Sequence, residues 1–167
     1  MNTQLQEAIL SRDLALVRHV LEIDPLSVHH KNEVGFSALM ICCTTEQPDM
    51  VALLLDAGAN VHNKGTETGF YALHCLFAHP AINEAATIKI LEMLLKHGAE
   101  INVRSLNSLT PLMLASWFGN EPAVRFLIER GADATVKDNS GKSAKDMALA
   151  KGHRTIVGFL DGLKAAK

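Results

Sequence analysis

A short word occurs twice in this sequence at a fixed distance, and this repetition constrains the fold more than any other feature. GFSAL begins at Gly35 and GFYAL begins at Gly69, 34 residues later. Each word is followed by an apolar stretch and then by a Gly-Ala pair. A period of 20–50 residues is typical of proteins built by stacking small, similar units. The sequence therefore predicts a stack of repeats, not one core wrapped by unrelated elements.

Aligning the chain with itself brings three copies into register on Leu39, Leu73 and Leu112. From this leucine to the closing glycine there are 19 residues in the first and third copies and 25 in the second. The middle copy therefore carries a six-residue insertion within 78–87. Each copy holds two stretches of helical periodicity, and the closing glycine suits the left-handed position after a helix. The polar stretches between copies are predicted to be hairpin-like loops.

The two ends of the chain are weaker copies of the same unit. Asp13 is predicted to be the N-cap of a second helix near the N-terminus. Lys145 stands where the other copies have leucine. Because terminal units of a stack need one wettable face, we expect this decay at the ends. The predicted organisation is one domain, 1–167, with five repeats: 1–31, 32–64, 65–104, 105–137 and 138–167.

The repeated segments of this chain resemble those of the ankyrin-repeat family. The matching segments are Leu109-Thr110-Pro111-Leu112, Ala72-Leu73-His74, Gly58-Ala59-Asn60-Val61, Gly98-Ala99-Glu100-Ile101-Asn102 and Gly131-Ala132-Asp133. The resemblance implies an all-α solenoid of stacked helix-turn-helix units with hairpin-like loops, as three full repeats between two capping repeats. It also implies a structural role for His74, whose ring would bond to the backbone of a turn.

This chain departs from the family pattern at several positions. Ser37-Ala38 and Tyr71-Ala72 replace Thr-Pro, so two helices lose the preset φ of proline. Ser108 replaces a turn glycine, which makes the expected turn less favourable. The insertion in the middle copy is a further departure.

Composition excludes several classes of function. The formal net charge is −2, without the basic stripe that a nucleic-acid groove needs. The sequence has no apolar run long enough for a bilayer span, no basic amphipathic helix and no signal-peptide pattern. The three cysteines, Cys42, Cys43 and Cys75, are expected to be buried in a reducing compartment. We expect a cytoplasmic protein, with a bacterial effector exported without an ordinary signal peptide as the alternative.

Catalysis and metal binding receive little support. Glu92 with His97, or Asp146 with His153, would be the acid–base pairs, but neither is joined by a nucleophile or an oxyanion donor. A metal site would have to use the first-helix residues Cys42, Cys43, His74, Cys75 and His79. These residues form neither Cys-x-x-Cys nor His-x-x-x-His. We therefore expect no enzyme activity, no cofactor and no metal.

A partner-binding surface is the favoured function. In the family's fold, the residue after the turn glycine lies on a loop finger facing a concave groove, and here that slot holds Phe36, Phe70, Leu109 and Lys142. Exposed apolar side chains in a row usually mark a binding site, and burying each contributes roughly 1.5–3 kcal/mol. The alternative is that Phe36 and Phe70 pack on one another or on loop stems. Predicted anchors are Phe36, Phe70, Tyr71, Leu109 and Trp117, with a polar rim of Lys64, Glu67, Asn107 and Asp138.

For Trp117 a second interpretation stays open, because the insertion of the neighbouring copy could simply cover it.

The predicted function is a monomeric protein–protein interaction module that binds a segment of an unidentified protein, without nucleic acid or membrane. One alternative is a homodimer formed through the apolar finger stripe. A second alternative is a small metal- or ligand-binding protein that uses the first-helix Cys and His residues.

Overall fold

In the computed structural model, residues 4–78 and 83–165 are described, and they form an all-α fold. The helices are α1 (Gln4–Leu10), α2 (Leu14–Ile23), η1 (Pro25–His29), α3 (Ala38–Thr44), α4 (Pro48–Asp56), α5 (Ala72–Cys75), α6 (Glu84–Lys96), α7 (Pro111–Trp117), α8 (Glu121–Glu129), α9 (Ala144–Ala150) and α10 (Arg154–Ala165). Over the described ranges there is no strand, and the β-type pairing is one isolated bridge between Lys31 and Ser37. The predicted fold class is confirmed.

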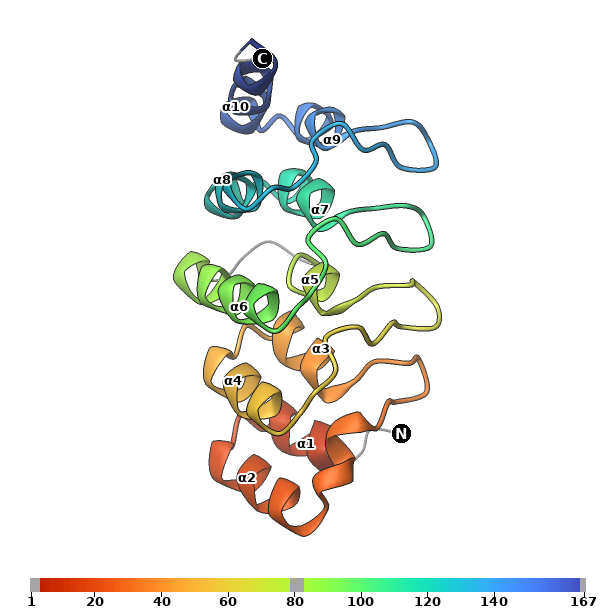
Figure 1. Ribbon diagram of the computed structural model, residues 1–167, viewed down its shortest axis with the longest axis vertical. Helices are drawn as coiled ribbons and strands as arrows, with labels where there is room; N and C mark the ends of the chain where they lie inside the picture. Colours follow the sequence, from red (N-terminus) through yellow and green to blue (C-terminus); the bar gives the residue numbers. More distant parts are fainter. Residues whose placement is uncertain (1–3, 79–82, 166–167) are drawn as a thin grey trace.

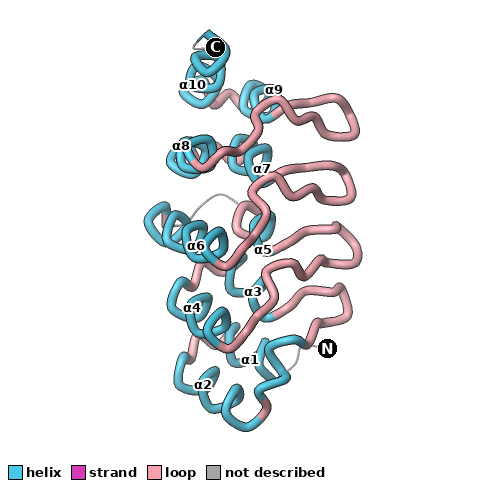
Figure 2. The backbone as a smooth tube through the Cα atoms, viewed as in Figure 1, coloured by secondary structure: helices cyan, strands magenta, loops and turns pink. Residues whose placement is uncertain are grey.

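Consecutive helices pair into units that stack along one axis (Figure 1). Unit 1 holds α1 and α2, unit 2 holds α3 and α4, and units 3 to 5 hold the remaining pairs in order. The first helices of the units form one layer and the second helices form another. The loops that precede α3, α5, α7 and α9, called finger loops below, project on the same side of the stack (Figure 2). The molecule is a helical solenoid.

Side chains cap several of the helices. The carboxylate of Asp13 accepts a hydrogen bond from the backbone N–H of Leu16, so the predicted N-cap of α2 is confirmed. Ser37, Thr110 and Ser143 cap α3, α7 and α9 in the same way. Such caps satisfy backbone donors that the helix itself leaves without partners.

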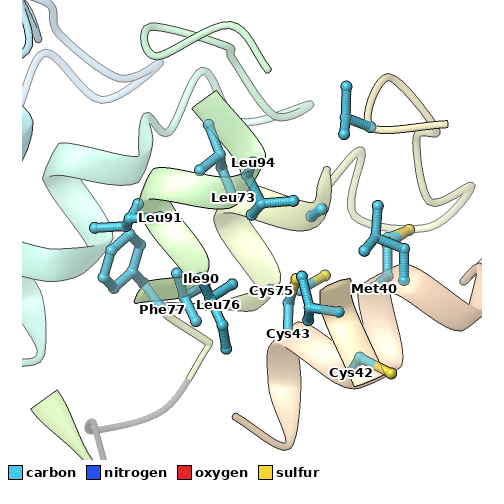
Figure 3. Close-up of a cluster of buried hydrophobic side chains, with 14 of the residues drawn as sticks. Met40, Cys42, Cys43, Leu73, Cys75, Leu76, Phe77, Ile90, Leu91 and Leu94 are labelled. Atoms are coloured by element: carbon cyan, nitrogen blue, oxygen red, sulfur yellow. The ribbon is translucent and has the colours of Figure 1, made fainter. Parts of the chain in front are cut away.

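One apolar core runs through the stack, because each unit completes the core of its neighbours. The second helices contribute Leu54, Leu94 and Leu127, all fully buried at equivalent positions. Figure 3 shows where units 2 and 3 meet, with Cys43 and Cys75 among leucines and isoleucines. A unit of this size alone would bury too little apolar surface to be stable.

The finger loops are joined to one another by a ladder of backbone hydrogen bonds. Its rungs run from Thr66 N–H to Val34 O (3.2 Å), from Leu106 N–H to Thr68 O (3.2 Å) and from Asn139 N–H to Asn107 O (3.1 Å). Glycine permits this close approach: a Cβ on Gly69, which has φ +68°, would lie 2.7 Å from the backbone nitrogen of Leu106. The fingers therefore form a tightly packed surface.

The insertion in the middle copy changes the lengths of both helices of unit 3. Helix α5 has four residues, whereas α3, α7 and α9 have seven. Helix α6 has 13 residues, whereas α4 and α8 have nine. A residue of unit 2 contacts the added first turn of α6: the Glu46 carboxylate accepts a hydrogen bond from the Asn83 N–H at 2.8 Å. Part of the insertion, 79–82, lies outside the described residues.

The two ends of the stack differ in polarity. At the C-terminal end, Lys145 and Asp161 form an ion pair at 2.6 Å and make that end wettable, as expected. At the N-terminal end, helix α2 exposes Leu16 and Ile23. Unit 5 therefore carries the expected polar pair together with one exposed leucine, Leu149 of α9, whereas unit 1 presents apolar side chains.

Candidate functional site

An open apolar groove of about 310 Å³ lies along helix α7. Helix α5 ends after four residues, so among the described residues of unit 3 the last turn of α7 has no helical counterpart. Helix α7 packs closely on α9 but only loosely on α5. The residues lining the groove are Phe70, Ala78, Leu109, Met113, Leu114, Trp117, Phe118 and Met147. We call this surface the α7 groove.

The α7 groove brings together three of the five predicted anchors. Phe70 and Leu109 come from neighbouring finger loops, and Trp117 comes from the last turn of α7. All three side chains are half-buried. They are therefore supported by the protein from one side and accessible from the other, as an anchor site requires.

His74 holds the finger side of the groove in place. The imidazole stacks on the Phe70 ring, with 5.2 Å between ring centroids and 17° between planes. Its Nε2–H donates a hydrogen bond to the carbonyl of Leu109 at 2.8 Å. Its Nδ1 accepts a hydrogen bond from the backbone N–H of Tyr71 at 3.3 Å. The structural role predicted for His74 is confirmed, and it extends to two groove residues.

These two hydrogen bonds require the neutral imidazole with its proton on Nε2, because a carbonyl can only accept and a backbone N–H can only donate. Burial lowers the pKa of His74 to about 4, although the hydrogen bond to Leu109 acts in the opposite direction. At neutral pH the ring is therefore uncharged, and the groove is apolar on this side.

The other end of the groove is fixed by unit 5. The Lys151 ammonium lies over the Trp117 ring, 4.0 Å from its centroid. The Nε2–H of His153 donates a hydrogen bond to the carbonyl of Trp117 at 3.1 Å. The His153 ring also lies against Gly119, where a Cβ would be 2.4 Å from the imidazole Cε1. Trp117 is therefore held by contacts across a unit boundary.

The structure does not bring Phe36 and Tyr71 to the groove. The Phe36 ring packs sideways over Gly65 of the next finger, where a Cβ would be 3.0 Å from its Cε1. Tyr71 lines a separate hollow of about 270 Å³, together with Val61 and Ala99. The Phe70 and Tyr71 rings both lie beside His74, with centroids 5.2 Å and 5.9 Å from that of its ring, but they line different hollows. The predicted finger stripe is thus divided between different surfaces.

The predicted rim residues also differ in their surroundings. Lys64 is exposed, with its ammonium 6.0 Å from the Tyr71 ring centroid, and Glu67 is exposed on its finger. Asn107 is exposed, and its backbone carbonyl belongs to the ladder between fingers. The Asp138 carboxylate accepts hydrogen bonds from the N–H groups of Ser140 and Lys142, so it closes its own turn.

Five groove residues were not among the predicted anchors, namely Met113, Leu114, Phe118, Met147 and Ala78. The first three have a visible signal, since they and Trp117 recur at i, i+1, i+4 and i+5 on one helix face. That spacing is the same for a helix face buried in the core. The sequence therefore could not show that the described residues leave this face of α7 uncovered. The insertion residues 80–82, which were the alternative cover for Trp117, lie outside the described residues.

Neither candidate acid–base pair is assembled. Glu92 forms an ion pair with Arg130 at 3.6 Å, while Nδ1 of His97 is hydrogen-bonded to the carbonyl of Met93. Asp146 closes a capping box with Ser143 at the start of α9, and His153 is bonded to Trp117 as described above. These side chains therefore serve the local structure of their helices.

The cysteines lie in the core. All three are free and buried, and burial raises the pKa of Cys75 to about 12 and those of Cys42 and Cys43 well above their usual range. Such thiols are poor nucleophiles and poor metal ligands at neutral pH. Among the residues that the structure describes, no three His, Cys, Asp or Glu side chains gather as a metal site would require. His79, a predicted candidate ligand, lies outside those residues.

Comparison with known proteins identifies the repeat. A family model described as ankyrin repeats (3 copies) matches residues 5–105 and 78–164. The chain belongs to the ankyrin-repeat family. Ankyrin repeats are generally protein–protein interaction modules, and the family is typically non-catalytic.

The similar proteins are much longer than this ankyrin-repeat chain. Protein glp-1 of Caenorhabditis elegans is 30% identical over 93% of the chain, which spans 12% of that protein. The transient receptor potential cation channel subfamily A member 1 homolog of the same organism is 29% identical, again over 93% of the chain and 12% of its own length. Ankyrin repeat protein nuc-2 of Neurospora crassa is 29% identical over 99% of the chain and 15% of its own length. The similarity therefore concerns the repeat region.

Within 4–78 and 83–165, no helix combines the length and the apolar character that crossing a bilayer requires.

Proposed function

We propose that this ankyrin-repeat chain binds a segment of another protein in the α7 groove, on the concave side formed by the finger loops and first helices. The observation that carries the proposal is an accessible groove lined by apolar side chains from two fingers and two helices. An exposed apolar surface of this kind is costly in water and is characteristic of partner-binding sites. The proposed anchor-binding residues are Phe70, Leu109 and Trp117, together with Met113 and Met147.

The groove favours a particular partner chemistry. Its walls are apolar and aromatic, so they suit one or two large apolar side chains of the partner. The exposed Lys151 ammonium lies over the Trp117 ring and places a positive charge beside the groove. A partner with an acidic residue close to its apolar anchor would pair with this ammonium. The two methionines give the groove walls some adaptability to the shape of the anchor.

The surroundings of the groove reduce the entropic cost of binding. The hydrogen-bonded finger ladder fixes the backbone on one side, and His74 fixes both Phe70 and Leu109. Contacts from Lys151 and His153 hold Trp117 on the other side. A surface that is ordered before binding loses little freedom when a partner arrives.

The alternatives predicted from the sequence have weaker support. A homodimer through the finger stripe would need Phe36 and Phe70 on one surface, but Phe36 packs on Gly65. Metal or ligand binding by the first-helix cysteines would need thiols that can reach solvent, and these are buried.

Buried free thiols suit a reducing compartment, so we propose that the interaction takes place in the cytoplasm.

The experiment is a selection of displayed random peptides on the purified chain, followed by fluorescence titration of the peptides obtained. Trp117 is the only tryptophan of the chain, so its emission reports on the groove alone. We expect the selected peptides to share a large apolar residue next to Asp or Glu. Binding of these peptides should shift the emission of Trp117. The Leu114→Glu variant should bind them more than about tenfold more weakly, equivalent to 1.4 kcal/mol.

The control is Leu106→Glu, which places the same charge on a leucine that is 52% exposed on a finger outside the groove, whereas Leu114 is 9% exposed. This variant should bind the peptides as the wild type does. The melting temperature of both variants is measured in parallel, so that a loss of fold is recognised. Peptides that bind without changing Trp117 emission, and that are insensitive to Leu114→Glu, would place the binding surface elsewhere.

A further inference from the structure

Each finger loop carries a basic residue at the same structural position. In all four fingers, a backbone N–H at the base of the loop donates a hydrogen bond to the carbonyl of the residue just before the helix cap, and this bond closes the loop. The residue directly before that N–H group is Lys or Arg every time. These residues are Lys31, Lys64, Arg104 and Lys137. Because the fingers stack side by side (Figure 2), the four residues form one row, called the basic row below.

Contacts between neighbouring fingers fix the direction of the basic row. The Lys31 ammonium donates a hydrogen bond to the carbonyl of Lys64 at 3.4 Å, and the Arg104 guanidinium donates one to the carbonyl of Lys137 at 2.9 Å. Each of these side chains therefore reaches from one finger to the same position of the next. All four residues are exposed, and a bond to a neutral carbonyl leaves the positive charge in place. The basic row thus presents an ordered line of charge to the solvent.

The carboxylates of the fingers do not neutralise this line. The ion pairs between described residues lie on the helices, and none of them includes a residue of the basic row. Two carboxylates near Lys137, those of Asp138 and Asp146, are held by hydrogen bonds of their own turn and helix cap. The fingers hold more basic than acidic side chains, although the net charge of the chain is −2. From the basic row to the helix caps, the basic side chains are the row itself and Lys142, and the acidic ones are Glu33, Glu67 and Asp138.

The spacing of the basic row favours one kind of anionic partner. Packed helices lie about 8–10 Å apart, so neighbouring cations of the row recur at about that distance. An extended polypeptide advances about 3.3 Å per residue, so every third residue matches this spacing. The phosphates of a nucleic-acid strand recur about every 3.4 Å, which is roughly three times as dense as the cations. The row therefore suits a peptide whose acidic residues are separated from one another.

We propose that the basic row binds an extended segment of a partner protein that carries Asp or Glu at about every third position. A single exposed ion pair contributes little, so the affinity comes from matching several charges at once. Attraction by the row acts over a distance and accelerates the encounter with the partner. None of its four residues lines the α7 groove, so this surface is independent of the proposed function.

Fluorescence anisotropy of a labelled peptide made of Glu-Gly-Ser repeats, one repeat per cation of the row, tests this proposal on the full chain. The titration is made at about 10 mM salt, where the screening length of about 30 Å covers the whole row. We expect saturable binding that weakens as salt is raised. A peptide of the same composition with its Glu residues adjacent should bind more weakly, and so should a single-stranded oligonucleotide of equal charge.

The variant that tests the row is Lys64→Glu with Arg104→Glu, which should weaken binding of the periodic peptide by at least about tenfold. The matched control is Arg18→Glu with Lys96→Glu, which changes the net charge equally at exposed residues of α2 and α6. The control should lose much less affinity, because its charges lie on second helices and not on the fingers.

Helical circular dichroism of each variant shows whether it is folded. Arg104 also bonds to the next finger, so if the double variant is unfolded, the exposed Lys64→Glu alone decides the question. Absence of binding at low salt overturns the proposal. So do equal losses in the two double variants, a peptide with adjacent Glu residues that binds as tightly as the periodic one, or an oligonucleotide that binds more tightly. None of these outcomes bears on peptide binding in the α7 groove.

Discussion

At the scale of single residues, His74 links the stability of the stack to pH. In the folded chain its pKa is lowered to about 4 from the ordinary value of 6.5. The unfolded chain therefore takes up this proton at a higher pH than the folded chain does. The stabilisation is complete above pH 6.5 and is lost as the pH falls towards 4. The pKa difference corresponds to about 3 kcal/mol at most.

We expect urea unfolding to give a lower free energy of unfolding at pH 4.5 than at pH 7, partly because of His74. Other groups titrate in this range, so the control is His74→Met, the residue that stands at the same helix position as Met40 and Met113. This variant loses the hydrogen bond to Leu109, which costs about 1 kcal/mol at pH 7. Its stability should change less between the two pH values. An unchanged pH dependence would show that His74 does not titrate as described.

A second residue-scale prediction concerns the glycines of the fingers. Gly69 and Gly141 occupy equivalent turns with φ values of +68° and +78°. A Cβ on Gly69 would lie 2.7 Å from the Leu106 backbone, whereas one on Gly141 would meet nothing within 4 Å. Gly141→Ala should cost about 1 kcal/mol from backbone strain alone. Gly69→Ala should cost more, because it also separates two fingers, and thermal unfolding of the two variants measures the difference. Equal losses would contradict the close packing of these fingers.

At the scale of elements, the start of α6 depends on two partners. The Asn83 side chain accepts a hydrogen bond from Ala86 N–H at 3.1 Å, and the Asn83 backbone N–H donates to Glu46 of unit 2. Asn83→Ala should lower the free energy of unfolding by about 1 kcal/mol, the usual contribution of an N-cap. Asn107→Ala, the same change on an exposed finger, should have little effect. Chemical denaturation of both variants checks this, and equal losses would show that Asn83 is not a cap.

The sequence predicts the elements well where repetition determines them. The words GFSAL and GFYAL and the closing Gly-Ala pairs locate the helix pairs, and Asp13 is the N-cap that was expected. The length of the insertion is also visible in the alignment. Its effect on the helices is not visible, because the start of α6 depends on a contact between units, the hydrogen bond from the Asn83 N–H to Glu46. Ser108 keeps its turn with φ +59°, so the missing glycine does not change the loop.

At the scale of the whole molecule, the α7 groove, which is the proposed binding surface, follows from the stacking of the units. Phe70 and Leu109, which line the groove, could be selected from the sequence because they depart from the polar residues common after the turn glycine, and Trp117 because it ends a first helix. Met113 and Met147 could not be predicted, because the same apolar periodicity describes a covered and an open helix face. The separation of Phe36 from Phe70 depends on how each finger packs on the next. The repeat boundaries 1–31, 32–64, 65–104, 105–137 and 138–167 stay predictions.

The most direct test of the binding surface is a methyl NMR titration of the methionines with a selected peptide. Met113 and Met147 line the α7 groove, whereas Met40 and Met50 are buried in unit 2 and serve as internal references. If the groove is the binding surface, the methyl signals of Met113 and Met147 shift on addition of the peptide and those of Met40 and Met50 do not. Shifts confined to Met40 and Met50, with Met113 and Met147 unchanged, would contradict the proposed site.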